Sequence, residues 1–196
     1  MTNIDNIKKV DIDDYEELDE YAKLFVEREK WNKLEEWDKF LNIIPIKKCS
    51  HFGEVNIFNL VPISCDKFTT EEIVKLIKEK NIKSWLILDI GCLLDIDINK
   101  IDTKFYFAPI DDFDVPSFET MNKIIEFVAE NVKTGNILTS CIGGHGRTGI
   151  VLSIWAGLNG IEKPIEYVRK IYCEKAVETL SQEMFVNIYL RYLKSL

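Results

Sequence analysis

The sequence predicts an α/β domain in which helices flank a mostly parallel central sheet. From Glu54 onward, short apolar stretches rich in branched residues and Phe alternate with stretches whose apolar residues recur at helical spacing. A buried apolar stretch then leads into a glycine-rich turn at residues 140–149, and such sheets bind ligands at the carboxyl ends of central strands. With 196 residues and 46% hydrophobic composition, the chain can bury one good core.

The first half of this domain is expected to form strands joined by one crossover helix. The segment Thr69–Ile77 predicts that helix, because a hydroxyl residue precedes the acidic Glu71 and Glu72 and apolar positions follow at helical spacing. The strands are expected at Val55–Val61, Trp85–Ile90 and Phe105–Ile110.

The second half is expected to be mainly helical around one buried strand. A helix should begin near Ser117, because Pro116 cannot continue a strand, and it should end before Gly135. The remaining elements are a strand at 136–140, an apolar helix over Thr148–Leu158 that stops at Asn159-Gly160, and helices over about 163–177 and 182–195.

Residues 1–43 are expected to form an N-terminal helical extension, and residues 44–196 the main domain. The extension is rich in Glu, Asp, Lys and aromatic residues, and its apolar residues indicate one or two amphipathic helices. This apolar stripe could pack on the main domain or dock a protein partner. Its members are Trp31, Leu34, Trp37, Phe40 and Leu41.

Composition restricts the partners and the compartment. The net charge is −8 and no run of Lys or Arg exceeds a pair, so neither nucleic acid nor an anionic membrane is expected as a partner. The first residues lack a basic start and an apolar stretch, and no apolar run approaches the roughly 20 residues of a membrane helix. A cytoplasmic location is therefore expected.

The five cysteines suggest neither a disulfide framework nor a zinc site. Their number is odd and no Cys-x-x-Cys pair occurs, so we expect mostly buried, reduced packing residues and no bound metal. Only Cys141 has surroundings that indicate chemistry. The others are Cys49, Cys65, Cys92 and Cys173.

The turn from Cys141 to Gly149 is suited to binding a tetrahedral oxyanion. Gly143, Gly144 and Gly146 allow successive backbone N–H groups to converge, and a helix beginning at Arg147 adds its positive end. The same surroundings should lower the pKa of Cys141 from about 8.5, and a guanidinium can hold two phosphoryl oxygens at once. Neither the Walker pattern nor a dinucleotide fingerprint matches this turn.

The motif Cys-x-Gly-Gly-x-Gly-Arg-Thr-Gly resembles the phosphate-binding loop of the protein tyrosine phosphatase superfamily, particularly its compact dual-specificity branch. The resemblance covers about residues 55–196. It implies a phosphatase-type fold, a catalytic domain over 44–196, the nucleophile Cys141, and a Thr148 hydroxyl that bonds the sulfur and eases its departure. The phosphate-binding residues that it implies are Ile142, Gly143, Gly144, His145, Gly146 and Arg147.

The segment Pro109–Ser117 resembles the general-acid loop of the same family and places the acid on Asp112. Negative charge on Asp111 and Asp114 should raise the pKa of Asp112, as protonating a leaving oxygen requires. The alternative is an ordinary acidic surface turn, since Asp is common beside proline in loops.

One further assignment rests on resemblance and has a simpler alternative. Glu178–Val186 resembles the family's glutamine-bearing stretch, which implies that Gln182 positions the hydrolytic water. Alternatively, Ser181 caps a helix and Gln182 is an exposed first-turn residue.

Ser140 stands where many family members have a histidine that helps to set the thiolate pKa. His145 could contact substrate, tune the thiolate or be exposed without a role, and His51 is expected to be structural.

The sequence therefore predicts a phosphatase that hydrolyses phosphotyrosine and also phosphoserine or phosphothreonine through a phosphocysteine intermediate, without metal or cofactor. The expected partner is a phosphoprotein substrate. Two alternatives stay open: a phosphatase for phosphoinositides or RNA 5′-triphosphates, and a phosphoprotein-binding module without turnover.

Overall fold

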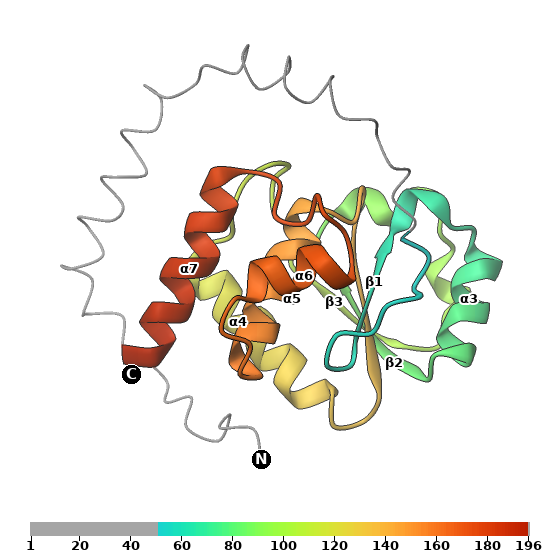
Figure 1. Ribbon diagram of the computed structural model, residues 1–196. Helices are drawn as coiled ribbons and strands as arrows, with labels where there is room; N and C mark the ends of the chain where they lie inside the picture. The colour runs from blue at the N-terminus through green and yellow to red at the C-terminus, as the bar shows by residue number, and fades with distance from the viewer. Residues whose placement is uncertain (1–50, 196) are drawn as a thin grey trace, which may run out of the picture. The chain divides into compact units, whose positions relative to one another are not determined.

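The computed structural model describes residues 51–195, which form an α/β unit around a four-stranded sheet (Figure 1). The strand order is β1-β4-β2-β3, and all four strands run parallel. The predicted fold class is confirmed, with β4 between β1 and β2 at the centre. The strands are β1 (Leu60–Ser64), β2 (Ile82–Ile87), β3 (Lys104–Phe107) and β4 (Asn136–Cys141).

Helices cover both faces of this sheet. Helix α3 (Thr70–Glu79) lies on one side, and the four later helices lie on the other (Figure 1). Those four are α4 (Phe118–Asn131), α5 (Gly146–Leu158), α6 (Pro164–Ile171) and α7 (Leu180–Ser195). Three short 3-10 turns lie in the connections after β1 and β2. Turn η3 (Cys65–Lys67) follows β1, and η4 (Ile90–Leu93) and η5 (Ile98–Lys100) lie between β2 and β3.

Side-chain alternation along the strands builds a core on each face. In β4, Leu138 packs on the α3 side and Ile137 on the side of α4–α7. In β2, Trp85 packs on the α3 side and Leu86 on the other. Helix α5 is buried along almost its whole length, from Gly146 to Ala156. An all-round apolar helix of this kind needs neighbours on every side, and α6 and α7 supply them.

The structure confirms the predicted hydroxyl cap of α3 and the predicted start of α4 near Ser117. Thr69 and Glu72 form a reciprocal capping box at the start of α3, in which the Glu72 N–H donates to Thr69 Oγ1 at 3.3 Å. Ser117 caps α4 by accepting from the N–H of Thr120 at 3.0 Å. Both helices therefore begin within one residue of the position that their capping residues indicate.

The sequence placed several boundaries wrongly. Strand β1 begins at Leu60 and not at Val55, because Phe58 and Asn59 adopt positive φ values of 47° and 72° in a tight turn before it. Strands β2 and β3 begin and end earlier than expected. Helix α6 ends at Ile171, six residues before the predicted end, and α5 begins two residues early at Gly146.

The expectation that the cysteines are reduced is wrong for two of them. Cys65 and Cys92 form a disulfide, with their Cα atoms 5.2 Å apart. They lie 27 residues apart in sequence, but β1 and β2 flank β4, so η3 and η4 meet at the carboxyl edge of the sheet. Cys65 Sγ also lies 3.3 Å from the carbonyl oxygen of Cys141.

The predicted extension at residues 1–43 lies outside the described residues. Within residues 51–195, no helix is both long and apolar enough to cross a membrane.

Two glycines of α5 test how closely the helix packs. A Cβ at Gly149 would lie 2.5 Å from the backbone nitrogen of Val177, whereas a Cβ at Gly157 would meet only the movable side chain of Leu190. Both changes to Ala gain the same helix propensity. We expect Gly149→Ala to be less stable than Gly157→Ala by about 1–3 kcal/mol in urea unfolding. Equal stabilities would contradict the close backbone approach.

Candidate active site

The predicted anion-binding turn joins the carboxyl end of β4 to the first turn of α5. Cys141 is the last residue of β4 and is 2% exposed. The Thr148 hydroxyl donates a hydrogen bond to Cys141 Sγ at 3.1 Å, as the resemblance implied. Since α5 begins at Gly146, the positive end of a buried helix faces the loop that holds this sulfur.

The carbonyl groups of this loop are held from outside it. Gly143 O accepts from the Ser64 hydroxyl at 2.6 Å and from His51 Nδ1 at 3.1 Å, and Gly144 O accepts from the Tyr172 hydroxyl at 2.6 Å. In a trans peptide the N–H points opposite to the C=O. The N–H groups of Gly144 and His145 therefore point away from these partners and remain available to an anion in the loop.

Gly144 is the position where glycine is indispensable. Its φ is +71°, and a Cβ there would lie 2.8 Å from His51 Nδ1 and 3.0 Å from the carbonyl oxygen of Ile63. Of the three glycines in the loop, Gly144 is therefore the one at a backbone turn that no other residue fits.

Arg147 lies inside the site rather than in solvent. Its side chain is 6% exposed, and Nη1 donates to Asp89 Oδ2 at 2.5 Å and to the carbonyl oxygen of Ile110 at 3.0 Å. Nη2 pairs with Asp112 Oδ1 at 2.9 Å. Two carboxylates and one carbonyl therefore orient the guanidinium from two connections, the one after β2 and the one after β3.

The predicted acid Asp112 is brought to the nucleophile's loop through this ion pair. Its side chain is 64% exposed, so the pair is weak and easily exchanged for another anion. The Asp112 carboxylate also accepts from the N–H of Phe113, whose φ of 58° marks a tight turn. Asp112 therefore lies on an exposed loop with a defined backbone turn, and its carboxylate is paired with other groups of the protein.

Gln182 is buried, so its alternative reading as an exposed first-turn residue is wrong. Its Oε1 accepts from the N–H groups of Glu178 and Thr179, at 2.9 and 3.4 Å, and its Nε2 donates to the carbonyl oxygen of Asp114 at 3.2 Å. The cap of α7 is Thr179, which accepts from Gln182 N at 3.2 Å, and not Ser181. Gln182 therefore joins the start of α7 to the acid loop.

Glu178 is a site residue that the sequence did not single out. Its Oε2 would be 2.6 Å from a Cβ on Gly146, and its carboxylate accepts a hydrogen bond from the Gly146 N–H. Glu178 is exposed as a residue, but partial burial of its carboxylate against the loop raises its pKa; the Gly146 hydrogen bond opposes this, while the negative charge of Asp112 adds to it. Glu178 therefore places a carboxylate beside the glycine-rich loop.

Both histidines lie against the loop, which the sequence did not indicate for His51. His51 is 1% exposed, and burial lowers its pKa. His145 is half-buried, and burial, aided by His51 and by the positive charges of Lys175 and Lys67, lowers its pKa to about 4. The alternative that His145 is simply exposed is therefore wrong. Ser140, where relatives often have histidine, accepts from Trp85 Nε1 at 2.8 Å.

Several residues of the site carried no recognisable sequence signal. Asp89 follows β2, and its position after a buried strand was the one available hint. Tyr172 lies just beyond α6 and His51 before β1, so each reaches the loop only through the folded chain. Glu178 lies four residues before Gln182. That spacing does not mark it as a site residue, because its contact with the loop depends on how the connection to α7 folds.

Comparison with known proteins agrees with this geometry. Residues 64–160 match a family model described as polymorphic toxin system, DSP-PTPase phosphatase. Two uncharacterized proteins of Methanocaldococcus jannaschii, MJECL20 and MJ0215, are each 44% identical to the chain. The alignments cover 74% and 75% of this chain and 97% and 91% of theirs. The chain belongs to the dual-specificity phosphatase-like cysteine phosphatases.

Solved structures of cysteine phosphatases share this fold. A mutant form of Tk-PTP superimposes with a TM-score of 0.60 at 21% identity, over 70% of this chain and 91% of that one. Kinase associated phosphatase with a serine for its catalytic-site cysteine gives 0.58 at 20%, over 70% and 87%. PTPMT1 in complex with PI(5)P gives 0.61 at 12%, over 72% and 96%. The parallel sheet of this chain, with its flanking helices, therefore has a phosphatase-type fold.

The raised pKa of Glu178 predicts a pH-dependent cost to stability. The folded protein holds this proton more tightly than the unfolded chain does, so stability falls as pH rises from about 4.5 through the folded pKa. We expect Glu178→Gln to gain stability relative to wild type across that window and to match it below the window. Urea unfolding at a series of pH values measures this difference.

Glu174→Gln, at another exposed glutamate of the same connection, controls for the loss of one negative charge. Identical pH dependence of the two variants would contradict the burial of the Glu178 carboxylate.

Proposed function

We propose that this chain is a cysteine-dependent protein phosphatase that hydrolyses phosphotyrosine, and also phosphoserine and phosphothreonine, through a phosphocysteine intermediate. The observation that supports it is the convergence of the Cys141 loop, the Arg147 guanidinium and the Asp112 carboxylate at one edge of the sheet. A site that only bound phosphate would need neither a nucleophile nor an acid.

The first step is attack by the anionic sulfur of Cys141 on phosphorus. The S–P bond forms, the bond to the leaving oxygen breaks, and Asp112 gives its proton to that oxygen. Arg147 exchanges the exposed Asp112 for a phosphoryl oxygen at Nη2, while Asp89 and Ile110 keep Nη1 in place. This exchange releases Asp112 toward the leaving group and leaves a guanidinium to stabilise charge in transit.

The second step returns the sulfur. Asp112 takes a proton from water, the water oxygen attacks phosphorus, and the S–P bond breaks. Thr148 supplies a hydrogen bond to the departing sulfur from its present position. We assign the orientation of the water to Gln182, whose amide has to release the carbonyl of Asp114 to do so.

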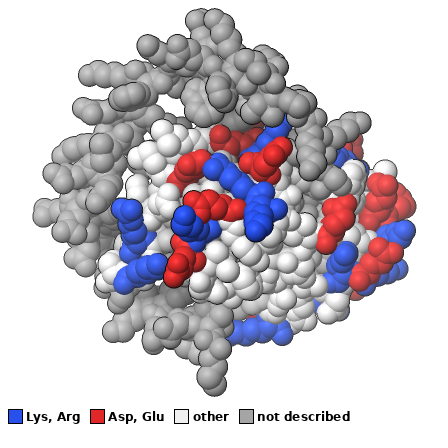
Figure 2. Space-filling model, viewed as in Figure 1, with Lys and Arg blue, Asp and Glu red and all other residues white. Residues whose placement is uncertain are grey.

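The rim of the site supports a protein substrate. Charged residues of the acid loop are the carboxylates of Asp111, Asp112 and Asp114, which would repel the polyanionic headgroup of a phosphoinositide or an RNA triphosphate. Figure 2 shows positive and negative side chains intermingled on the face it presents. Exposed apolar side chains beside the loops suit a peptide: Ile90, Leu94, Phe113, Ile142 and Leu180.

The phosphocysteine intermediate gives the first test of this function. We expect wild type to hydrolyse p-nitrophenyl phosphate in EDTA, and Cys141→Ser to lose about 10⁴-fold or more in kcat. Acid quenching during turnover should leave one phosphoryl group on the wild-type peptide that contains Cys141, seen by mass spectrometry. Cys49→Ser is the control for loss of a thiol elsewhere in the chain and should keep its turnover. An inactive wild type at every pH would support the binding-module alternative.

The role of Asp112 gives a second test. We expect Asp112→Asn to lower kcat for a phosphoserine peptide by about 10²- to 10⁴-fold, because an alkoxide leaves poorly without a proton. The loss should be smaller for p-nitrophenyl phosphate, whose leaving group needs less help. Asp111→Asn, one residue away, is the matched control. Equal effects of the two changes would remove Asp112 from the acid role.

A substrate panel separates the remaining alternatives. Under the proposal, phosphotyrosine and phosphoserine peptides are turned over faster than phosphoinositide vesicles or 5′-triphosphate RNA. Preference for the vesicles would instead match the lipid bound in the PTPMT1 structure.

A further inference from the structure

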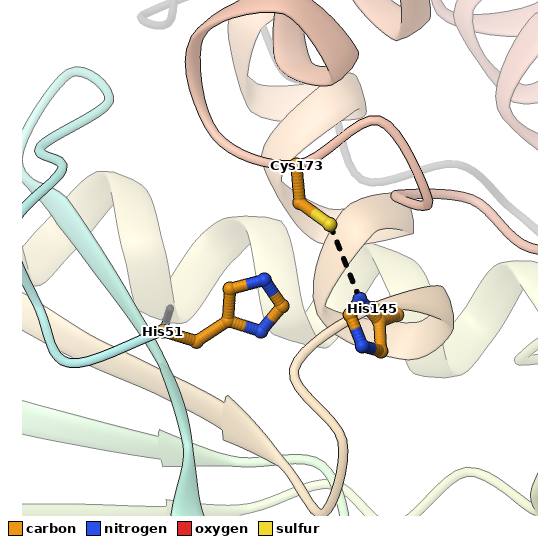
Figure 3. Close-up of side chains that lie close together, drawn as sticks. All are labelled: His51, His145 and Cys173. Atoms are coloured by element: carbon orange, nitrogen blue, oxygen red, sulfur yellow. Dashed lines mark hydrogen bonds between the residues drawn. The ribbon is translucent and has the colours of Figure 1, made fainter. Parts of the chain in front are cut away.

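Three side chains converge behind the phosphate-binding loop, on the side away from the proposed chemistry. They are His51, His145 and Cys173, which come from the segment before β1, from the loop, and from the connection after α6 (Figure 3). One potential ligand atom of each lies within 4.8 Å of those of the other two. The chain has only two histidines, and both lie here.

His51 directs an unused lone pair into this cluster. Its Nδ1 must carry the proton, because Gly143 O can only accept and lies 3.1 Å away, while the neighbouring Ser64 hydroxyl already donates to that carbonyl. Nε2 is then the acceptor. Within residues 51–195 this buried nitrogen has no hydrogen-bond partner, although the residue is 1% exposed. A buried acceptor left in this way needs a partner.

The other two ligand atoms already touch. Cys173 Sγ lies 3.3 Å from His145 Nδ1, as the dashed line in Figure 3 marks. Cys173 is buried and is not part of a disulfide. Two imidazole nitrogens and one thiolate form a donor set that suits Zn²⁺ among the common biological ions.

We propose that His51 Nε2, His145 Nδ1 and Cys173 Sγ bind one Zn²⁺ ion, with water as a fourth ligand. Tetrahedral zinc with bonds of about 2.0–2.3 Å keeps its ligand atoms roughly 3.3–3.6 Å apart. Closing the cluster to that size takes small side-chain rotations, and the Cys173 proton is released to solvent on binding. The hydrogen bond from His51 Nδ1 to a carbonyl is the support that zinc-bound histidines usually have.

The proposed ion would fix the back of the loop without contacting the nucleophile. It would connect the loop at His145 to the segment before β1 and to the connection between α6 and α7. The neighbouring Tyr172 already holds the loop through the Gly144 carbonyl at 2.6 Å. Positive charge on Lys67 and Lys175 opposes a cation here, and the thiolate of Cys173 offsets part of it.

The test uses Co²⁺ as a spectroscopic substitute and Zn²⁺ as the competing ion. We use the full chain carrying Cys141→Ser, which removes the nucleophilic thiol as a rival ligand. We expect one equivalent of Co²⁺ to give thiolate-to-cobalt charge-transfer absorption, and Zn²⁺ to abolish it. Zn²⁺ should also raise the Tm of this protein, since an ion that binds only the folded state stabilises it.

Adding Cys173→Ser should remove the charge-transfer band and weaken Zn²⁺ binding by more than the roughly 10- to 100-fold that loss of a supporting residue costs. His145→Ala should weaken binding similarly and gives a second variant if the first fails to fold by circular dichroism. Cys49→Ser is the matched control and should change neither readout. Absence of the band, or its persistence in folded Cys173→Ser protein, would overturn the proposal.

Discussion

The buried guanidinium of Arg147 is the interaction on which the site depends. Through it, the loop after β4 is connected to the carboxyl ends of β2 and β3, by Asp89 after β2 and by the carbonyl of Ile110 after β3. A buried cation requires such partners, because an unpaired one costs several kcal/mol. The same contacts orient the side chain before any phosphate arrives, so that binding does not have to order it.

The two carboxylates on Arg147 have different surroundings and hence different uses. Asp89 is 16% exposed and pairs with Nη1, as a permanent support would, whereas Asp112 is 64% exposed and pairs with Nη2. Solvent weakens the second pair much more than the first. Under the proposed mechanism substrate displaces Asp112 while Asp89 stays, so that one arginine is both anchored and available.

The loop is supported on its outer side by groups that never meet the substrate. Ser64, His51 and Tyr172 hold two successive carbonyls, and this orientation is what frees the amides for an anion. On the opposite side the Glu178 carboxylate occupies the Gly146 N–H. The protein therefore holds a carboxylate of its own beside the loop that we propose as the phosphate site.

Local chemistry accounts for what the sequence alone determined. The cap at Thr69, the helix start near Ser117, the buried strand before Cys141 and the glycine-arginine pattern after it depend on neighbouring residues, and these were predicted within a residue or two. Asp112 was placed by its resemblance to the acid loop, and the structure brings its carboxylate to Arg147.

Only the tertiary structure decided which distant residues meet at this loop. The strand order puts β4 between β1 and β2, and that order brings together the Cys65–Cys92 disulfide, Asp89 and His51 from separate parts of the chain. For Gln182 the sequence left two interpretations, an amide that positions water and an exposed first-turn residue; the residue is buried, because the acid loop covers the start of α7. Spacing along a chain reports contacts within one element, whereas contacts between elements follow from how those elements pack.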